Sequence, residues 1–205
     1  MRGRREDERP HLRPDEVHAD GGRPDEGRPG LGRPDERHLG GGRPAGCAGA
    51  VIRPYRPEDK PGVVAVIKSV YDDFNYILDF DVFDADLVDI QSTYEDAGGA
   101  FWVLDDGGMI AGCVGVLPKE GDACELKRLY LGKAYRRRGW GTRLLAMARG
   151  WAIARGFRRM VLWSDVLFEP AHRLYVKSGF RATRETRAID PTNPTSVERF
   201  FEADL

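Results

Sequence analysis

The chain has 205 residues, with 32 basic and 33 acidic side chains and a formal net charge of −1 at pH 7. This balance lacks the electrostatic footprint of a nucleic-acid-binding protein, so we expect no nucleic-acid partner. Its three cysteines are an odd number without ligand-like spacing, and three of its four histidines precede residue 48. The sequence therefore predicts neither a disulfide framework nor a metal site.

Residues 1–48 differ sharply in composition from the rest of the chain. After the initiator Met they contain only four large aliphatic residues and no Trp, Tyr, Phe or Ile, and Arg-Pro-Asp-Glu recurs in them with a period of ten residues. A segment so poor in apolar surface cannot offset its ordering entropy. We expect a disordered low-complexity leader that catalysis does not need, either a repeat that recruits a partner or sequence translated from a misassigned start. One domain is expected at residues 49–205.

The beginning of the chain also bears on localisation. Met-Arg-Gly-Arg-Arg starts like a secretory signal, but charged residues follow where an apolar stretch of about 7 to 15 residues belongs. No run approaches the roughly 18 apolar residues of a membrane-spanning helix. We therefore expect a cytoplasmic protein without a membrane partner.

Apolar periodicity and turn residues divide the domain into strands and helices. Asp105-Asp106-Gly107-Gly108 is a strong hairpin signal, and residues 141–155 carry a broad apolar stripe at helical spacing. The expected elements are a strand at 51–54, a helix from Pro57, a loop at 75–83, a helix from Asp84, strands at 100–104, 109–117 and 123–131, a helix at 141–155, a strand at 160–163, a helix at 169–178, and strands at 180–187 and 196–203 joined by a loop at 190–194. This order predicts an α/β (α+β mixed sheet) fold, with antiparallel strands first and one strand-helix-strand crossover in the middle.

The densest chemical signal lies between a predicted strand and an amphipathic helix and reads Tyr135-Arg136-Arg137-Arg138-Gly139-Trp140-Gly141-Thr142. Glycines there let backbone N–H groups turn toward one point at a helix N-terminus, and arginines add charge that pairs with phosphate oxygens. A solvated basic loop or a nucleic-acid contact has a similar composition. The segment fits neither the longer phosphate loop of nucleotide hydrolases nor the dinucleotide fingerprint, which requires a further glycine.

Three groups of residues together resemble the GCN5-related N-acetyltransferase (GNAT) superfamily: Leu129-Tyr130-Leu131, Arg136-x-x-Gly139-x-Gly141 and Ala171-x-x-Leu174-Tyr175-x-x-x-Gly179-Phe180. The resemblance covers residues 50–203 and implies a splayed, mostly antiparallel sheet with helices on both faces and acetyl-CoA in a central cleft. It also implies that the backbone of residues 138–142 holds the pyrophosphate and that residues 129–131 pair with the pantetheine arm like an extra strand. The residues expected to contact acetyl-CoA are Leu129, Tyr130, Leu131, Arg136, Arg137, Arg138, Gly139, Trp140, Gly141 and Thr142.

Acetyl transfer to an amine requires a base, because a lysine-like amine with a pKa of about 10.4 arrives as a cation. Glu125 lies eleven residues before Arg136, where the resemblance to protein-lysine acetyltransferases of this superfamily places the glutamate base. Its alternative role is a salt bridge with Lys127 on the same strand face. Tyr175 occupies the position of the family's proton donor to the departing thiolate; its alternative role is a ring packed in the core with a hydrogen-bonded hydroxyl.

Phe168 departs from the family pattern, which often has an asparagine there to position the pantetheine. Asp165 or Ser164 could substitute for it, or no residue does. His172 follows on the same predicted helix, and we interpret it as a surface or packing residue. The resemblance also implies a backbone N–H near Tyr130 or Leu131 facing the carbonyl oxygen of the thioester.

The first half of the domain is expected to bind the acceptor. Residues 51–120 carry 5 basic and 14 acidic residues, against 17 and 9 in residues 121–205. This excess of carboxylate predicts a cationic small-molecule amine bound by Asp72, Asp79 and Asp81, although a solvated acidic face has the same composition. A peptide acceptor, through a protein lysine or N-terminus, is the alternative substrate, and an acetyl-CoA-binding sensor without turnover is the alternative function. We expect a monomer or a homodimer.

Overall fold

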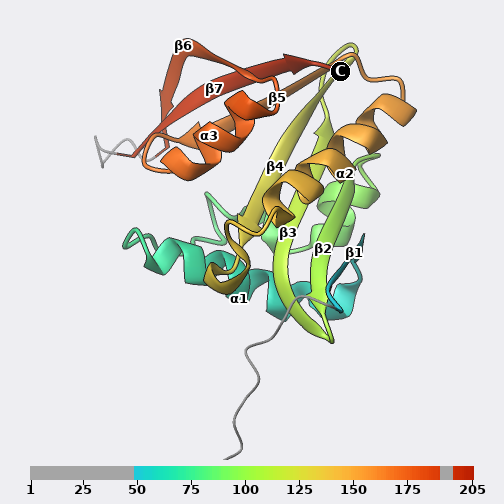
Figure 1. The fold of residues 1–205 in the computed structure, drawn as a ribbon, viewed down its shortest axis with the longest axis vertical. Coiled ribbons are helices and arrows are strands. Elements are labelled where there is room, and N and C mark those ends of the chain that lie inside the picture. The colour runs from blue at the N-terminus through green and yellow to red at the C-terminus, as the bar shows by residue number, and fades with distance from the viewer. Residues whose placement is uncertain (1–48, 190–195) are drawn as a thin grey trace, which may run out of the picture. The chain divides into compact units, whose positions relative to one another are not determined.

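The computed structural model describes residues 49–189 and 196–205, so the expected leader at 1–48 and the loop at 190–194 lie outside the described residues. Seven strands form one sheet in the order β1-β2-β3-β4-β5-β7-β6 (Figure 1). The strands are β1 Val51–Pro54, β2 Ala100–Asp106, β3 Met109–Pro118, β4 Ala123–Leu131, β5 Arg159–Asp165, β6 Arg181–Ala188 and β7 Val197–Asp204. Only the β4–β5 pair is parallel in this sheet. The predicted mixed, mostly antiparallel fold is confirmed.

Helices cover both faces of the sheet (Figure 1). They are α1 Lys60–Asp72, α2 Trp140–Ala154 and α3 Glu169–Lys177, with the short helices η1 Pro57–Asp59, η2 Ala85–Leu87, η3 Gln91–Glu95 and η4 Lys133–Tyr135. Apolar residues of α1, η2 and η3 form a core with one face of β2 and β3. Those of α2 and α3 form a second core on the opposite face. Within the described residues, no helix combines the length and the apolar character that crossing a membrane requires.

The helix predicted from Asp84 is wrong as a continuous α-helix. The structure has a short 3₁₀-helix, η2, and a π-helical turn, η3, in its place. The Ser92 N–H donates to Asp89 Oδ1 at 3.0 Å instead of continuing an α-helical ladder, and the Val88 carbonyl accepts a hydrogen bond from Lys60 Nζ. The apolar residues that suggested the helix are nevertheless buried together, namely Leu87, Ile90 and Tyr94. The periodicity thus identified the buried residues but not the backbone conformation.

A β-bulge in β4 changes which side chains face the cleft. Cys113 pairs with Tyr130 and Gly115 with Lys127, so two residues of β4 oppose one residue of β3. Arg128, at the bulge, has a φ of 55°, in the left-handed region that is rare outside glycine. The extra residue reverses which side chains of β4 face each side of the sheet. After the bulge, Tyr130 packs in the core that contains α1, whereas Leu129 and Leu131 pack in the core that contains α2.

Strands β4 and β5 pair over only a short distance. Their parallel register runs from Ala123–Arg159 to Glu125–Val161. Beyond Glu125, the described residues show no further pairing between these two strands. The sheet therefore splays open next to Glu125, and the backbone of residues 126–131 faces the opening.

Candidate active site

A cavity of about 1630 Å³ lies where β4 and β5 diverge. It is lined by β4, the end of α1 and the segment after it, the start of α2, the end of β5, α3, and the adjoining ends of β6 and β7. The predicted site residues that line it are Glu125, Leu129, Tyr130, Leu131, Arg136, Arg137, Gly139, Gly141, Thr142, Tyr175, Asp79 and Asp81. Residues predicted for acetyl-CoA binding, for catalysis and for acceptor binding, which lie between positions 79 and 175, thus line the same cavity.

Three predicted site residues do not line this cavity. Trp140 is buried, and its ring lies 4.1 Å from the Arg143 guanidinium carbon, so it anchors the first turn of α2. Asp72 pairs with Lys68 at 2.8 Å on the exposed surface of α1. Arg138 is exposed and also lies outside the lining.

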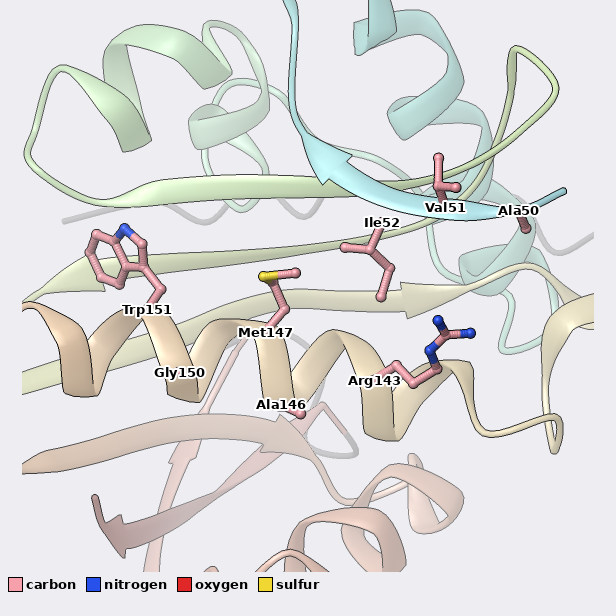
Figure 2. Close-up of a pocket in the computed structure, with 8 residues that line it drawn as sticks. All are labelled: Ala50, Val51, Ile52, Arg143, Ala146, Met147, Gly150 and Trp151. Atoms are coloured by element: carbon pink, nitrogen blue, oxygen red, sulfur yellow. The ribbon is translucent and has the colours of Figure 1, made fainter.

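A second cavity, of about 640 Å³, lies between β1 and α2 (Figure 2). Its walls are mainly aliphatic and aromatic, with Arg143 as their charged side chain, and consist of Ala50, Val51, Ile52, Arg143, Ala146, Met147, Gly150 and Trp151. None of the residues predicted for binding or catalysis lines it. The larger cavity is therefore the candidate active site.

The start of α2 lines the larger cavity and has features that favour an anion. Gly139, at the N-cap of α2, has a φ of 82°, and no side chain caps the first amide groups of the helix. Arg136 donates from Nε to the Leu131 carbonyl at 3.0 Å and from Nη1 to Asp73 at 3.0 Å. Its Nη2 is buried without a hydrogen-bond partner among the described residues. An unpaired guanidinium nitrogen beside uncapped amides fits a diphosphate.

Glu125 is the last residue of β4 that pairs with β5, so its side chain lies where the cleft opens. The side chain is 13% exposed, and its carboxylate lies 3.5 Å from Lys119 Nζ. Lys119, not Lys127, is therefore its ion-pair partner. Because Lys119 is 53% exposed, this pair contributes little energy and leaves the carboxylate available to a cationic substrate.

Tyr175 reaches the cavity from α3 while its ring packs in the core. The ring is 5.8 Å from Phe180 and 5.6 Å from Phe201 between centroids. Burial raises the pKa of the Tyr175 phenol above its ordinary value. The phenol is therefore protonated at neutral pH, as a proton donor must be.

Aromatic side chains occupy the region where many family members have an asparagine. The Phe168 ring lies 4.8 Å from that of Phe74 and 6.3 Å from that of Tyr130. The buried Asp165 accepts hydrogen bonds from the Tyr76 hydroxyl at 2.6 Å and from the Leu167 N–H at 2.8 Å. Both carboxylate oxygens of Asp165 are thus bound within the protein, which argues against its substituting for the asparagine. His172 packs against Phe201 at 4.9 Å, and burial lowers its pKa, as expected of a packing residue.

Asp79 and Asp81 lie in the segment after α1, but their surroundings differ. Asp79 Oδ1 accepts hydrogen bonds from the backbone N–H groups of Asp81 and Val82, both at 3.0 Å. Its carboxylate therefore stabilises a turn. Asp81 is exposed and lines the cavity, so of the three predicted acceptor residues it is the best placed to attract a cation.

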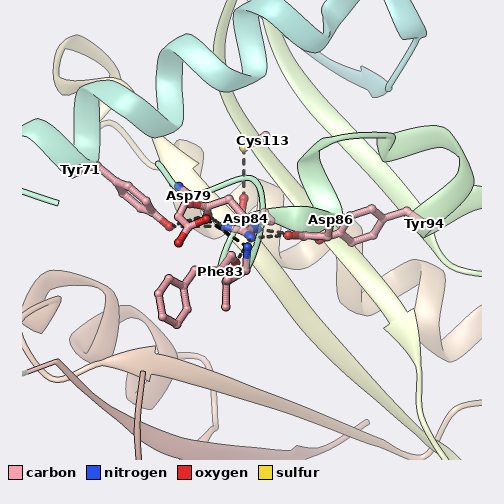
Figure 3. Close-up of polar contacts among 9 residues, drawn as sticks. Tyr71, Asp79, Phe83, Asp84, Asp86, Tyr94 and Cys113 are labelled. Carbon is pink, nitrogen blue, oxygen red and sulfur yellow. Dashed lines mark hydrogen bonds and ion pairs between the residues drawn. The ribbon is translucent and has the colours of Figure 1, made fainter. Parts of the chain in front are cut away.

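Sequence reasoning missed an arginine that joins β4 to this segment. Arg128 binds Asp84 at 2.7 Å and also binds Asp86. Figure 3 shows the two carboxylates together with Tyr71, Phe83 and Tyr94, which complete the network. Burial is the largest single influence on Asp86 and acts to raise its pKa, but the hydrogen bond and charge of Arg128, together with the hydrogen bond from Tyr94, lower the pKa below its ordinary value. The only signal in the sequence was the acidic run itself, which gives no indication of an internal partner.

The comparisons with known proteins agree with this geometry. The family model described as Acetyltransferase (GNAT) family matches residues 65–180. The uncharacterized N-acetyltransferase YjgM of Escherichia coli (strain K12) is 31% identical over 135 residues, which are 63% of this chain and 81% of that protein. The N-acetylaspartate synthetase of Danio rerio is 30% identical over 122 residues, 57% of this chain and 43% of that protein, so the chain spans less than half of that relative.

A solved structure has the same fold. The acetyltransferase of the GNAT family from Staphylococcus aureus Mu50 superimposes with a TM-score of 0.67 and 25% identity, over 76% of this chain and 99% of that chain. The family model spans more than half of the 205 residues. The chain therefore belongs to the acetyltransferase (GNAT) family of N-acetyltransferases.

Proposed function

We propose that the protein transfers an acetyl group from acetyl-CoA to a cationic primary amine of a small molecule. One observation carries this proposal: Glu125, Tyr175 and the start of α2 line the same cavity at the divergence of β4 and β5. The diphosphate would lie against Arg136 and the first amides of α2. The pantetheine arm would lie along the backbone of residues 129–131, which β5 does not cover.

In this mechanism side chains transfer the protons, and a backbone N–H stabilises the negative charge that develops on the carbonyl oxygen of the thioester. Glu125 accepts a proton from the acceptor ammonium, directly or through water, and this frees the lone pair for attack on the thioester carbonyl. A backbone N–H near Tyr130 or Leu131 stabilises negative charge on the carbonyl oxygen. As the C–N bond forms and the C–S bond breaks, Tyr175 donates its proton to the thiolate, and the second proton of the attacking nitrogen replaces it. The products are the amide, the thiol of CoA and one released proton.

A CoA-release assay over a panel of amines and peptides, with calorimetry for acetyl-CoA, tests cofactor and acceptor separately. Turnover of small amines supports the proposal, whereas turnover of peptides alone would favour a protein lysine or N-terminus as acceptor. Tight acetyl-CoA binding without turnover of any acceptor would indicate a sensor, and no binding of CoA or acetyl-CoA would overturn the assignment. Repeating the assay on a chain that begins at Gly49 tests our proposal that residues 1–48 are a leader that catalysis does not need.

Two substitutions test the assigned roles. We expect Glu125→Gln and Tyr175→Phe each to lower kcat by about 100-fold or more, because proton transfer contributes on that scale. The affinity for acetyl-CoA should be unchanged by calorimetry, since neither side chain touches the anion site. Glu120→Gln, at an exposed residue between β3 and β4, is the control and should retain full activity. Unchanged kcat in either variant would remove that residue from the mechanism.

An acceptor that also carries a carboxylate is a second candidate. Lys127 lines the cavity and projects from the same face of β4 as Glu125, two residues away. One relative is named an N-acetylaspartate synthetase, a name that describes an acetylated amino acid as product. Lysine and cadaverine differ by one carboxylate, so Lys127→Met should raise the KM for lysine and spare that for cadaverine. Equal effects on both amines would contradict this candidate.

A further inference from the structure

We propose that Arg128 is a positioning residue for the acceptor. Its guanidinium fastens residues 79–86, hereafter the acceptor segment, to the bulge of β4, three residues after Glu125. The inference rests on the proposed function, because this segment is the one expected to meet the acceptor. It assigns a role to a side chain that takes no part in the proton transfers.

The contacts of Arg128 use its whole guanidinium. Nη1 donates to Asp84 Oδ1 at 2.7 Å and to the Tyr71 hydroxyl at 3.3 Å, and Nη2 donates to the Phe83 carbonyl at 3.1 Å and to Asp86. Nε donates to Asp86 Oδ2 at 3.0 Å. The side chain of Arg128 is 8% exposed and that of Asp84 1% exposed, so solvent screens these bonds weakly.

The carboxylates extend the attachment to the rest of the segment (Figure 3). Asp84 Oδ2 accepts the backbone N–H of Asp79 at 2.9 Å, which fixes the beginning of the acceptor segment. Asp86 Oδ2 accepts the Tyr94 hydroxyl at 2.5 Å, which ties its end to the core under β2 and β3. One arginine therefore holds both ends of the segment.

Apolar burial holds the residues that flank the acceptor segment, Leu78 and Leu87, but not the large side chains of the segment itself. Phe80, Val82 and Phe83 are 39%, 67% and 42% exposed, and all three line the cavity. A loop with exposed large side chains gains little stabilisation from apolar burial, so burial does not restrict it to one conformation. The Arg128 network is then the main attachment of the segment to the strand that bears Glu125.

The backbone at Arg128 is adapted to the same purpose. A φ of 55° is unfavourable for a residue with a Cβ, and here the buried Cys113 thiol donates a hydrogen bond to the Arg128 carbonyl at 3.1 Å. This bulge places Tyr130 on the α1 side of the sheet, in the cavity lining with Glu125. The guanidinium and the bulge together set the distance between the acceptor segment and the catalytic strand.

Arg53 provides a matched control for a purely structural arginine. It binds Asp59 through two nitrogens at 2.7 and 2.8 Å and Asp105 at 2.8 Å, a network like that of Arg128. Arg53 lies on β1 and does not line the candidate active site. Arg53→Met should therefore lower stability and leave the acceptor KM unchanged.

The experiment compares Arg128→Lys, Arg128→Met and the triple variant Arg128→Met, Asp84→Asn, Asp86→Asn, which leaves no buried unpaired charge. Steady-state kinetics would use acetyl-CoA and the amine of the panel with the highest kcat/KM, with calorimetry for acetyl-CoA. We expect the acceptor KM to rise about tenfold or more in the Met and triple variants and less in the Lys variant. The acetyl-CoA dissociation constant should change less than about twofold, because the anion site is not attached to this network.

Hydrogen exchange of the full-length chain provides a readout that needs no acceptor. Amides of residues 79–86 should exchange faster in the triple variant and not in Arg53→Met. If the wild type turns over no amine, the proposed function fails. The exchange pattern then tests by itself whether Arg128 attaches the acceptor segment to β4. An acceptor KM equal to that of the wild type in a folded triple variant, or unchanged exchange in the acceptor segment, would overturn the inference.

Discussion

At the scale of single residues, carboxylates that look alike in the sequence have different tasks. Asp84 and Asp86 neutralise Arg128, Asp73 pairs with Arg136 and Lys133, and Asp165 binds Tyr76. Part of the acidic excess in the first half of the domain is therefore neutralised within the protein by cations of the second half. The charge that faces an incoming amine reduces to a few exposed or half-buried groups, chiefly Glu125 and Asp81.

Charge reversal at Asp81 tests whether this residue attracts the acceptor. We expect Asp81→Lys to raise the KM of a cationic amine about three- to tenfold at low salt and to have less effect at high salt, because the group is exposed and screened. Steady-state kinetics at two ionic strengths would measure it, with Glu58→Lys on η1 as the control. Asp79 is less suitable, because its carboxylate also holds a turn. An unchanged KM at low salt would remove Asp81 from acceptor binding.

At the scale of elements, the junction between β4 and α2 combines a left-handed glycine with an uncapped helix start. A Cβ at Gly139 would meet no atom within 4 Å, so its constraint is the φ of 82° and not space. Gly107, in the β2–β3 hairpin, has the same open surroundings and a φ of 64°. The two glycines therefore form a matched pair: Gly139 lines the cavity at the proposed anion site, whereas Gly107 does not line the cavity.

Replacing each glycine by alanine separates strain from binding. We expect both variants to lose about 1 to 2 kcal/mol of stability, the cost of a left-handed alanine. Only Gly139→Ala should weaken acetyl-CoA binding, by about tenfold, because the strained loop no longer presents its amides in one direction. Urea unfolding and calorimetry would measure the two effects. Equal acetyl-CoA affinity in both variants would contradict the assignment of the anion site.

At the scale of the whole domain, ion pairs link elements that are distant in sequence. Arg53 joins β1 to η1 and β2, and its hydrogen bonds lower the pKa of Asp59 below the ordinary value of 3.8 even though burial opposes the shift. A carboxylate with a depressed pKa contributes stability above its unfolded pKa, and this contribution is lost as the pH falls through the folded value. The stabilisation from Arg53 is therefore present at neutral pH and disappears in acid.

Arg53→Met should lower the free energy of unfolding by about 1 to 3 kcal/mol at pH 7. The difference from the wild type should shrink as the pH falls below about 4, because Asp59 is protonated in the unfolded chain there. Urea unfolding at pH 7 and near pH 3 would measure both values. Lys68→Met, which removes an exposed pair with Asp72 on α1, is the control and should cost about 0.5 kcal/mol or less. A pH-independent difference would show that packing, not charge, explains the loss.

Local pattern was sufficient for much of the fold. The hairpin turn at 105–108, the apolar stripe that became α2 and the crossover from β4 to β5 all follow from neighbouring residues, whose period and turn chemistry act over short distances. Because the prediction used only neighbouring residues, it was wrong about a continuous α-helix from Asp84. There, Asp89 and Lys60 supply hydrogen bonds that redirect the backbone, and sequence spacing does not reveal such partners.

The sequence by itself determined the family resemblance, the order of the elements and the residues expected to hold a diphosphate and move protons, because these depend on residue types at short, regular spacing. Only the tertiary structure decided that Glu125 pairs with Lys119, that Asp72 lies outside the cleft and that Arg128 attaches the acceptor segment to β4. Charged side chains form ion pairs with the groups that lie close to them in space, whatever their separation in the sequence. Those distances are set by a bulge and by the divergence of two strands, which no local pattern encodes.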